Sequence, residues 1–564
     1  MKLKHTVGSK NRQKTLKEER SFLLGNNIGD YLWLGDVPES RYQGWFITND
    51  ETEEKMYKVI DDIRPVNRTK VKTLENKFSR VVRSGKKFKE TFELFDNANG
   101  FVYKTEKRKK IELVLDMRES YSTDQPNYRI EKEGDRLIIT AEGENNLILA
   151  ITGFSDIDQV EEQFVRNYEL DKERNSYPYQ RTVFKAVIMT GKKLFFSASK
   201  DRATAVSNLK KSVKSKKNES KKEPIDFIAA KAGLENLVLE KNIYAGFPWF
   251  FQFWKRDTAI SLRGLYLINK KKAKDVFWAL IEGESRGPRG NKIVDGPGWV
   301  YKRAFLFLNQ FDQSEKQKLS DKLFETVNFD NYSELKLNKK KETWMDSISR
   351  DGARIELQAL RLSKYKLGRV VDKKRSGEYE RMEKELRKKV KKLFWDGSIL
   401  ADGYHPEVGS VDKTIRPNIF LAYYIYPELL SREEWKKCFR KALDRLWLDW
   451  GGLATVDKTD YRFHSLHTGE NPESYHQGDS WFFVNNLAAV AMNRLDDNTF
   501  TYEIKSILEA SREDLLWNGA IGHHSEVSSA EKLRAQGTVS QAWSLATYLE
   551  IMYEIVKINN YDWA

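Results

Sequence analysis

Residues 245–261, AGFPWFFQFWKRDTAIS, place six aromatic rings in the eight positions from Phe247 to Trp254 and then continue into Lys255, Arg256 and Asp257. A core helix rarely ends its apolar run on adjacent opposite charges, and an exposed loop rarely contains two tryptophans. Ring faces followed by a guanidinium and a carboxylate can grip a ligand that has both apolar faces and polar edges.

Segments with a similar composition recur through the second half of the chain. Sugar rings pack their C–H faces on Trp and Tyr, and their hydroxyls are held by carboxylates, Arg and amides. Cleavage of a glycosidic bond also needs two carboxyl groups, one protonated and one ionised. The residues of these types are Asp295 and Trp299 in VDGPGWVY, Trp344, Asp346 and Glu356 in KETWMDSISRDGARIELQAL, Arg416 and Asn418 in IRPNIFLAYY, Tyr475, His476, Gln477 and Trp481 in ESYHQGDSWFF, and Glu526 and Gln541 in the segment 521–544.

Each of these segments has an ordinary structural explanation as well. An Asp that follows a Trp-Met pair, such as Asp346, is more often a helix N-cap or an ion-pair partner than a catalyst. Tryptophan is buried on average, so core packing explains each Trp as well as sugar stacking does. The composition therefore indicates a carbohydrate site as a class and leaves the individual roles open.

Two kinds of element must position these residues. Up to about residue 200, short β-branched runs such as 109–118, 136–143, 146–154 and 182–199 alternate and are bounded by turn residues, which predicts an antiparallel β-sandwich. After residue 225, apolar residues recur at i, i+3/i+4 and i+7, which predicts one large α domain. We expect an N-terminal domain at 1–207, a Lys-rich linker at 208–224 and a helical domain at 225–564.

Composition excludes several other classes of protein. The single cysteine, Cys438, rules out an internal disulfide and a cysteine-based zinc site, and the histidines show no metal-binding spacing. No apolar run is long enough to span a membrane, and residues 1–14 lack a secretory h-region. We expect a cytoplasmic protein without metal or cofactor.

The net charge of +15 allows nucleic-acid binding. The excess is diffuse apart from 208–224, and a solvated linker explains that run better than an RNA-binding helix. We therefore expect no nucleic-acid or membrane partner, and the sequence leaves the oligomeric state open.

The ordered motifs resemble those of the glycogen debranching enzyme (amylo-α-1,6-glucosidase) family of bacterial and archaeal type, which is related to glucoamylases. GFPWFFQFWKRDTAISLRGL resembles that family's G-F-P-W-F…W-G-R-D-T element, and ETWMDSISRDGARIELQALR resembles its T-W-M-D element. IRPNIFLA, SYHQGDSW and SEVSS…QGTVSQAWS resemble three later elements, and residues 21–47 resemble the N-terminal signature. The resemblance implies a β-sandwich followed by an (α/α)6 barrel that hydrolyses α-1,6 branch points of glycogen-like glucan with inversion.

Matched position by position, the family's motifs imply specific roles. Asp346 would be the general acid and Glu526 the general base. Arg256 and Asp257 would grip the terminal glucose. The further substrate-binding positions implied or made plausible by these motifs are Trp254, Trp299, Trp344, Glu356, His476, Gln477 and Trp481.

Some positions depart from the family pattern. Lys255 replaces a Gly, and Asp479 lies in an altered T-V-W-P-W element, which bears on branch-point and chain-length preference. Three alternatives stay open: a glucoamylase- or trehalase-like α-glucosidase, a catalytically inactive glucan-binding protein, and a nucleic-acid-binding protein.

Overall fold

The computed structural model describes residues 3–8, 12–16, 21–48, 55–143, 146–211, 223–283, 293–327, 334–496 and 498–557. Most of the expected linker at 208–224 lies outside these residues. The chain divides into two compact units: unit 1 comprises Met1–Leu239, Gly246–Phe251 and Leu515–His524, and unit 2 comprises Glu240–Ala245, Gln252–Asp514 and Ser525–Ala564. The division therefore differs from the expected boundary at residue 224, because two later segments belong to the strand-rich unit.

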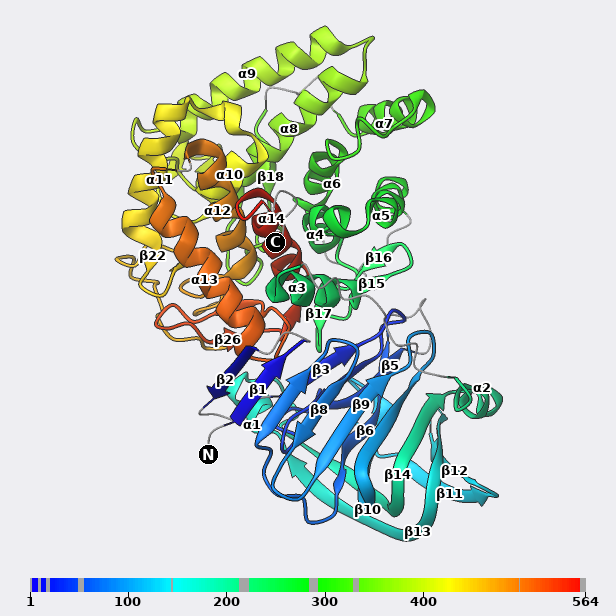
Figure 1. Ribbon diagram of the computed structural model, residues 1–564. Coiled ribbons are helices and arrows are strands. Elements are labelled where there is room, and N and C mark those ends of the chain that lie inside the picture. Colours follow the sequence, from blue (N-terminus) through cyan, green and yellow to red (C-terminus); the bar gives the residue numbers. More distant parts are fainter. Residues whose placement is uncertain are drawn as a thin grey trace. The chain divides into compact units, whose positions relative to one another are not determined.

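Unit 1 contains, within the described residues, a 14-stranded sheet (Figure 1). Its strands are β1 (Leu3–Val7), β2 (Arg12–Leu16), β3 (Phe22–Gly25), β4 (Tyr31–Leu34), β5 (Gly44–Thr48), β6 (Met56–Pro65), β7 (Thr73–Asn76), β8 (Val81–Ser84), β9 (Lys89–Leu94), β10 (Gly100–Glu119), β11 (Asn127–Glu133), β12 (Arg136–Glu142), β13 (Leu147–Asn167) and β14 (Gln180–Ser199). Three helices of this unit are α1 (Glu169–Glu173), α2 (Arg202–Asn208) and α3 (Ile225–Glu235).

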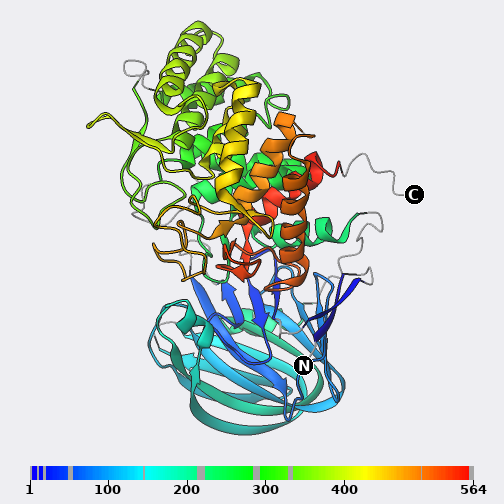
Figure 2. The same cartoon turned by 90° about the vertical axis from the view of Figure 1, so that its left-hand side faces the viewer.

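The strands form one hydrogen-bonded network rather than the two separate sheets of the expected sandwich. The cause is the length of β10, which pairs with β9 along Phe101–Thr105 and with β6 along Ile111–Glu119, so the sheet branches there. Register shifts between β10 and β14 add bulges that increase twist. The sheet consequently curls, as Figure 2 shows. One pair, β1 with β7, is parallel, which corrects the expectation of a purely antiparallel arrangement.

Unit 2 is built from helices. They are α4 (Lys255–Ile268), α5 (Lys270–Glu282), α6 (Gly296–Ala304), α7 (Gln313–Glu325), α8 (Ile355–Val371), α9 (Ser376–Phe394), α10 (Asn418–Ile425), the 3-10 turn η1 (Pro427–Leu429), α11 (Arg432–Leu446), α12 (Phe482–Asp496), α13 (Thr501–Trp517), whose last turn belongs to unit 1, and α14 (Ala542–Glu554). Among the described residues, the even-numbered helices form a closed cycle: α4 packs on α6, α6 on α8, α8 on α10, α10 on α12, α12 on α14, and α14 on α4.

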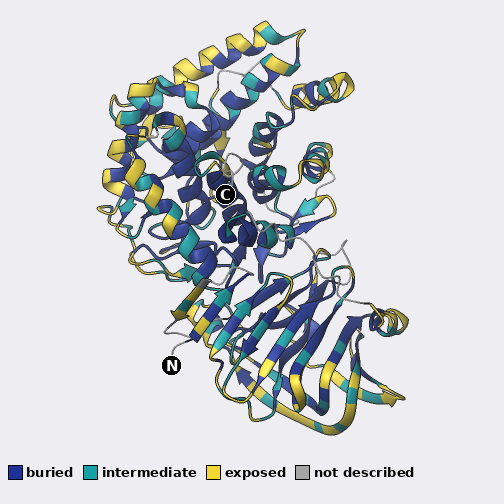
Figure 3. Ribbon diagram, viewed as in Figure 1, coloured by how far each residue is buried: buried dark blue, intermediate teal, exposed yellow. Residues whose placement is uncertain are grey.

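The burial of each helix follows its sequence pattern. Every residue of α10 is buried, and α14 is buried along nearly its whole length, as expected for helices that are apolar on all sides. By contrast α9 and α11 carry a buried stripe and a charged outer face, which Figure 3 shows as alternating blue and yellow. The helical second part of the chain is thus confirmed, and the cycle includes helices that are buried on all sides, such as α10 and α14.

Short strands connect the helices and carry several site residues. Their bounds are β15 (Val238–Leu239), β16 (Asn242–Ile243), β17 (Gly246–Phe247), β18 (Leu337–Asn338), β19 (Gly352–Arg354), β20 (Gly403–His405), β21 (Ser410–Asp412), β22 (Trp447–Leu448), β23 (Gly452–Leu453), β24 (Ser480–Trp481), β25 (Val527–Ser528), β26 (Ala535–Gln536) and β27 (Ser540–Gln541). None of the described helices is long and apolar enough to cross a membrane.

The aromatic segment 245–261 is divided between the units. Phe247 packs 5.1 Å from the Tyr31 ring, and Trp249 lies 5.8 Å from Tyr42 with the Arg174 guanidinium 3.2 Å above its ring, all within unit 1. The first rings of the segment are therefore core residues of the strand-rich unit. The segment from residue 252 onward belongs to unit 2 and leads into α4.

Candidate active site

A guanidinium links two carboxylates at the start of α4. Arg256 lies in the first turn of the helix, where its Nε donates to Asp257 Oδ2 at 3.3 Å and its Nη2 donates to Asp346 Oδ2 at 3.3 Å. Arg256 and Asp257 are 5% and 4% exposed. Residues far apart in sequence, from α4 and from the TWMD segment, thus meet in one ion cluster.

Burial raises the pKa values of the carboxyls in this cluster. It raises that of Asp257 to about 6, with Asp346 adding to the rise and Arg256 opposing it. It raises that of Asp295 to about 7, again opposed by Arg256. The pKa of Asp346 is also raised by burial and lowered by Arg256, with a net rise. Several carboxylates around one guanidinium repel one another, so ionising all of them is costly. The cluster therefore favours keeping at least one carboxyl protonated.

Asp346 is presented from a loop whose neighbouring side chains face inward. Trp344 and Met345 are 2% and 0% exposed, whereas the Asp346 side chain is 39% exposed. Trp344 Nε1 donates to Asn418 Oδ1 at 2.8 Å, and the Trp344 backbone N–H donates to Asp295 Oδ2 at 2.9 Å. The loop is therefore fastened on both sides while the Asp346 carboxyl stays accessible to a ligand.

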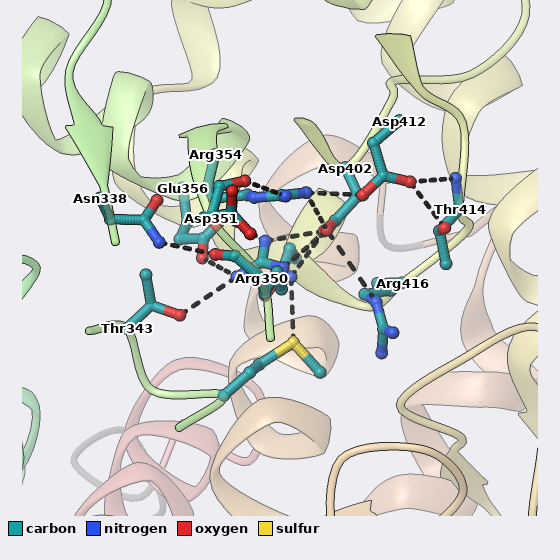
Figure 4. Close-up of polar contacts among 12 residues, drawn as sticks. Asn338, Thr343, Arg350, Asp351, Arg354, Glu356, Asp402, Asp412, Thr414 and Arg416 are labelled. Carbon is teal, nitrogen blue, oxygen red and sulfur yellow. Dashed lines mark hydrogen bonds and ion pairs between the residues drawn. The ribbon is translucent and has the colours of Figure 1, made fainter. Parts of the chain in front are cut away.

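A buried ion network supports this loop from behind (Figure 4). Arg350 donates to both oxygens of Glu356 at 2.6 and 2.8 Å and to both oxygens of Asp402 at 2.6 and 2.8 Å. Asn418 Nδ2 donates to Asp402 Oδ1 at 2.8 Å, which joins the network to the residue that holds Trp344. Burial alone would raise the pKa of Asp402, but Arg350, Arg354 and Arg416 hold it well below its usual value. Asp402 is therefore ionised, and the network is permanently charged.

Glu356 has a different place from the one expected for a sugar-gripping residue. It is 1% exposed at the start of α8, and both of its oxygens are occupied by Arg350. A carboxylate engaged in this way orients Arg350 rather than a ligand.

Glu526 is held by two hydrogen-bond donors just before β25. Tyr475 Oη donates to Glu526 Oε1 at 2.6 Å, and the Thr538 backbone N–H donates to Oε2 at 3.0 Å. Glu526 is 2% exposed, and burial raises its pKa to about 8, with Glu470 adding to the rise and the two hydrogen bonds opposing it. Gly537 has φ +63, and a Cβ at this position would overlap Glu526 Oε2. The carboxyl is thus fixed by both hydrogen bonding and packing.

Tyr475 connects the two proposed catalytic carboxyls. Burial raises the pKa of Tyr475, and the charges of Glu526, Glu470 and Asp346 add to that rise. The Tyr475 ring lies 4.7 Å from Trp481, which in turn meets Trp344 of the TWMD loop at 5.5 Å. Packing therefore joins the segment that carries Asp346 to the tyrosine that holds Glu526.

The aromatic residues expected in the site form a packed group. His476 stacks on Trp481 with 4.7 Å between ring centroids, and Trp344 meets Trp481 edge-on at 5.5 Å. Ser347 Oγ lies 2.7 Å from His476 Nδ1, and burial keeps the pKa of His476 well below its usual value, so the imidazole is neutral. Trp299, also 2% exposed, packs 6.2 Å from Tyr424. Trp344, His476 and Trp481 therefore form one packed aromatic group, and Trp299 packs against Tyr424.

The remaining expected residues lie at the edge of this group. Trp254 is half-buried at the N-cap of α4, with the Arg256 guanidinium 5.9 Å from its ring. Gln477 uses its amide within its own loop, donating to the Pro472 carbonyl at 2.6 Å. Of the two departures from the family pattern, Lys255 is half-buried and burial lowers its pKa, whereas Asp479 is buried and lies 2.6 Å from His467 Nδ1.

Several residues that build the site were given no role by the sequence. Tyr475 lies next to His476 in the SYHQGDSW motif, but the sequence does not show that its hydroxyl faces Glu526, and that contact defines its role. Arg350 and Asp402 gave no signal, because an ion pair formed across 52 residues leaves no spacing pattern. Asp295 was noticed for its composition alone.

Three comparisons with known proteins bear on these observations. A bacterial glucoamylase crystallised with acarbose has a similar structure, with a TM-score of 0.60, 11% sequence identity, and coverage of 96% of this chain and 95% of that one. The GH63 mannosylglycerate hydrolase of Thermus thermophilus, in complex with Tris and D-glycerate, matches with a TM-score of 0.46 and 11% identity over 57% of this chain and 99% of that one. No curated protein matches in sequence.

The glucoamylase likeness shows the fold, and the family is shown by the sequence itself. The sequence profile of the amylo-alpha-1,6-glucosidase family matches residues 224–308 and 325–550, together more than half of the chain. These ranges contain the Arg256 cluster, the TWMD loop with its supporting network, and Glu526 with Tyr475. The chain belongs to the amylo-alpha-1,6-glucosidase family of glycosidases.

Proposed function

We propose that the chain is an inverting α-glucosidase that releases glucose from α-1,6 branch points of a glycogen-like α-glucan. The observation that carries the proposal is a pair of carboxyls held by different partners: Asp346, partly exposed, on the Arg256 guanidinium, and Glu526, buried, on two fixed donors. Two such carboxyls suffice for glycosidic hydrolysis.

Asp346 acts as the general acid. Its pKa is raised by burial, so it can carry the proton that it donates to the glycosidic oxygen as the bond to the anomeric carbon breaks. Arg256, within hydrogen-bond reach of Asp346 Oδ2, then stabilises the carboxylate that this transfer leaves.

Glu526 acts as the general base. Its ionised form accepts a proton from a water that forms the new bond to the anomeric carbon on the face opposite the leaving oxygen. The Tyr475 hydroxyl and the Thr538 N–H stabilise that ionised form. Because burial raises the pKa of Glu526 to about 8, roughly a tenth of the molecules carry an ionised Glu526 at pH 7.

Arg256 and Asp257 grip hydroxyls of the terminal glucose, with Trp254, Trp299, Trp344, His476, Gln477 and Trp481 shaping the pocket. The closed cycle of six helices among the described residues supports an (α/α)6 barrel, as does the glucoamylase likeness. That glucoamylase was crystallised with acarbose, which supports an α-glucan as the substrate class here.

The proposal is tested with Asp346→Asn and Glu526→Gln. Each is expected to lower kcat for glucose release from panose by about 10²–10⁴-fold. The matched control is Asp372→Asn, which changes a buried Asp that is 4% exposed and caps the end of α8. Wild-type turnover by either site variant would refute the assigned roles.

A substrate panel tests the linkage. Faster release of glucose from panose and isomaltose than from maltooligosaccharides is expected. Preference for maltooligosaccharides or trehalose would instead favour a glucoamylase- or trehalase-like activity. Binding of glucan without release of glucose would favour a non-catalytic protein.

A further inference from the structure

A groove of about 270 Å³ in unit 1 is lined by a concentrated set of positive charges. It lies between the β8–β9 turn and the middle of β10, and we call it the lysine groove. Its ionisable residues are Lys86, Lys87, Lys89, Glu106, Lys107 and Lys109. The positive charge of the chain is therefore not diffuse in this region, contrary to the expectation from the sequence.

The geometry of β10 creates one wall of the groove. The register between β10 and β14 shifts between Lys104, which pairs with Lys193, and Lys109, which pairs with Gly191. The extra residues on β10 form a bulge, and Lys107 within it is exposed. Bulges re-aim side chains and are built features of sheets rather than defects.

Five lysines line the groove against one carboxylate, that of Glu106. Among the residues that the structure describes, none of the five forms an ion pair or a hydrogen bond through its ammonium group. Other lysines of the same sheet are paired: Lys104 with Glu93 at 2.6 Å and Lys185 with Glu112 at 2.8 Å. The sheet thus pairs neighbouring lysines with carboxylates, whereas the groove sets five lysines against the one carboxylate of Glu106.

A second basic groove, on α11, provides a contrast within the same chain. It has a volume of about 670 Å³ and is also rich in Lys and Arg. There Lys436 pairs with Asp496 at 2.7 Å, Lys437 donates to the Gly397 carbonyl at 2.6 Å, and Lys441 donates to Ser398 Oγ at 2.9 Å. The ammonium groups of these three lysines are therefore engaged by the protein itself.

The chemistry of the lysine groove selects its ligand. Its aromatic residue, Phe88, is 8% exposed and offers no open ring for a base or a sugar to stack on. The Thr105 hydroxyl already donates to the Lys107 carbonyl at 2.8 Å. What remains is a set of ammonium donors, which bind phosphate oxygens as point charges.

We propose that the lysine groove is a binding site for a small, phosphate-dense anion, namely a linear oligophosphate group. The small volume fits several linked phosphates better than the long backbone track of a nucleic acid, and the lack of a stacking platform points the same way. The site does not depend on the glycosidase activity proposed above, since neutral glucan has no charge to place there.

Titration calorimetry of the full chain with inorganic tripolyphosphate tests the proposal. The variant Lys86→Gln/Lys87→Gln/Lys107→Gln changes three exposed residues of the groove. It is expected to weaken tripolyphosphate binding at least tenfold, with an unchanged thermal melting curve. The control Lys436→Gln/Lys437→Gln/Lys441→Gln removes the same charge from the α11 groove and is expected to change the affinity less than twofold.

The same experiment can overturn the proposal in three ways. No heat of binding at millimolar tripolyphosphate would refute the site. Equal losses in the two triple variants would show that net charge alone attracts the anion. Tighter binding of a 20-nucleotide single-stranded RNA, or of vesicles containing phosphatidylserine, that is lost only in the Lys86/Lys87/Lys107 variant would replace the oligophosphate with a nucleic acid or a membrane surface.

Discussion

Tyr475→Phe is expected to change the pH dependence of catalysis by acting on Glu526. The substitution removes the 2.6 Å hydrogen bond to Glu526 Oε1 and leaves a ring of the same shape. A hydrogen bond to a charged group contributes about 1.5–3 kcal/mol, which corresponds to about 1–2 pKa units. Since the bond stabilises the ionised carboxylate, its loss raises the Glu526 pKa further above its value of about 8.

The expected result follows from the requirement that the base be ionised. At pH 7, kcat/KM for glucose release from panose should fall by about 10- to 100-fold, because the ionised fraction falls by that factor. Near pH 10 the wild-type base is fully ionised and the variant base largely so, and the two enzymes should differ by only about twofold. The assay is a kcat/KM profile from pH 5 to pH 10.

Tyr426→Phe is the matched control. Tyr426 Oη donates to Glu383 at the same distance, 2.6 Å, and neither residue belongs to the candidate site. This variant should lose stability while keeping the wild-type pH profile. A loss in Tyr475→Phe that is equally large at every pH would refute the reasoning, because it would show that Tyr475 acts through geometry alone.

Three further predictions concern the support of the two carboxyls. Gly537→Ala should lower kcat at least tenfold in panose assays, because the new Cβ would overlap Glu526 Oε2. The control is Gly134→Ala: Gly134 has a similar φ of +61 but open space around it, so this variant should keep the wild-type kcat. Glu526→Gln should stabilise the fold on thermal melting. The stabilisation relative to wild type should grow from pH 5 to about pH 8 and reach the order of a few kcal/mol. The reason is that the pKa of Glu526 is higher in the folded than in the unfolded protein, so the wild-type protein loses stability as pH rises through this window. Arg350→Met should cost about 3–5 kcal/mol in chemical denaturation, since it leaves the buried Glu356 carboxylate without its guanidinium and removes one of the cations around Asp402.

The sequence predicted elements that have a local periodic pattern of apolar residues, and it missed features that depend on contacts between distant parts of the chain. Within the expected helical domain, α13 (Thr501–Trp517) forms where apolar residues keep a regular helical spacing. In contrast α10, NIFLAYYI, has no polar face, and a periodicity argument cannot detect a helix that is buried on all sides. The strands of β10 and β14 were recognised, but the branching of the sheet depends on pairing across the chain.

The same division applies to the site. Arg256, Asp346 and Glu526 were singled out because they occur in segments with a distinctive composition, and the structure joins Arg256 to Asp346 directly and holds Glu526 on Tyr475. Trp249 was quoted in the same segment as Arg256 yet packs in unit 1, since adjacent residues in a sequence can belong to different cores. Glu356 matched a family element, but its partner Arg350 decides its role, and that contact could not be read from the sequence.

The most direct test of the proposed mechanism is the configuration of the first product, followed by proton NMR during hydrolysis of panose before mutarotation. Inversion by Asp346 and Glu526 predicts that β-glucose appears first and that the α-anomer grows in later at the rate of spontaneous mutarotation. Initial release of α-glucose would contradict the account, because it would require one carboxylate to act as a nucleophile rather than as a base for water.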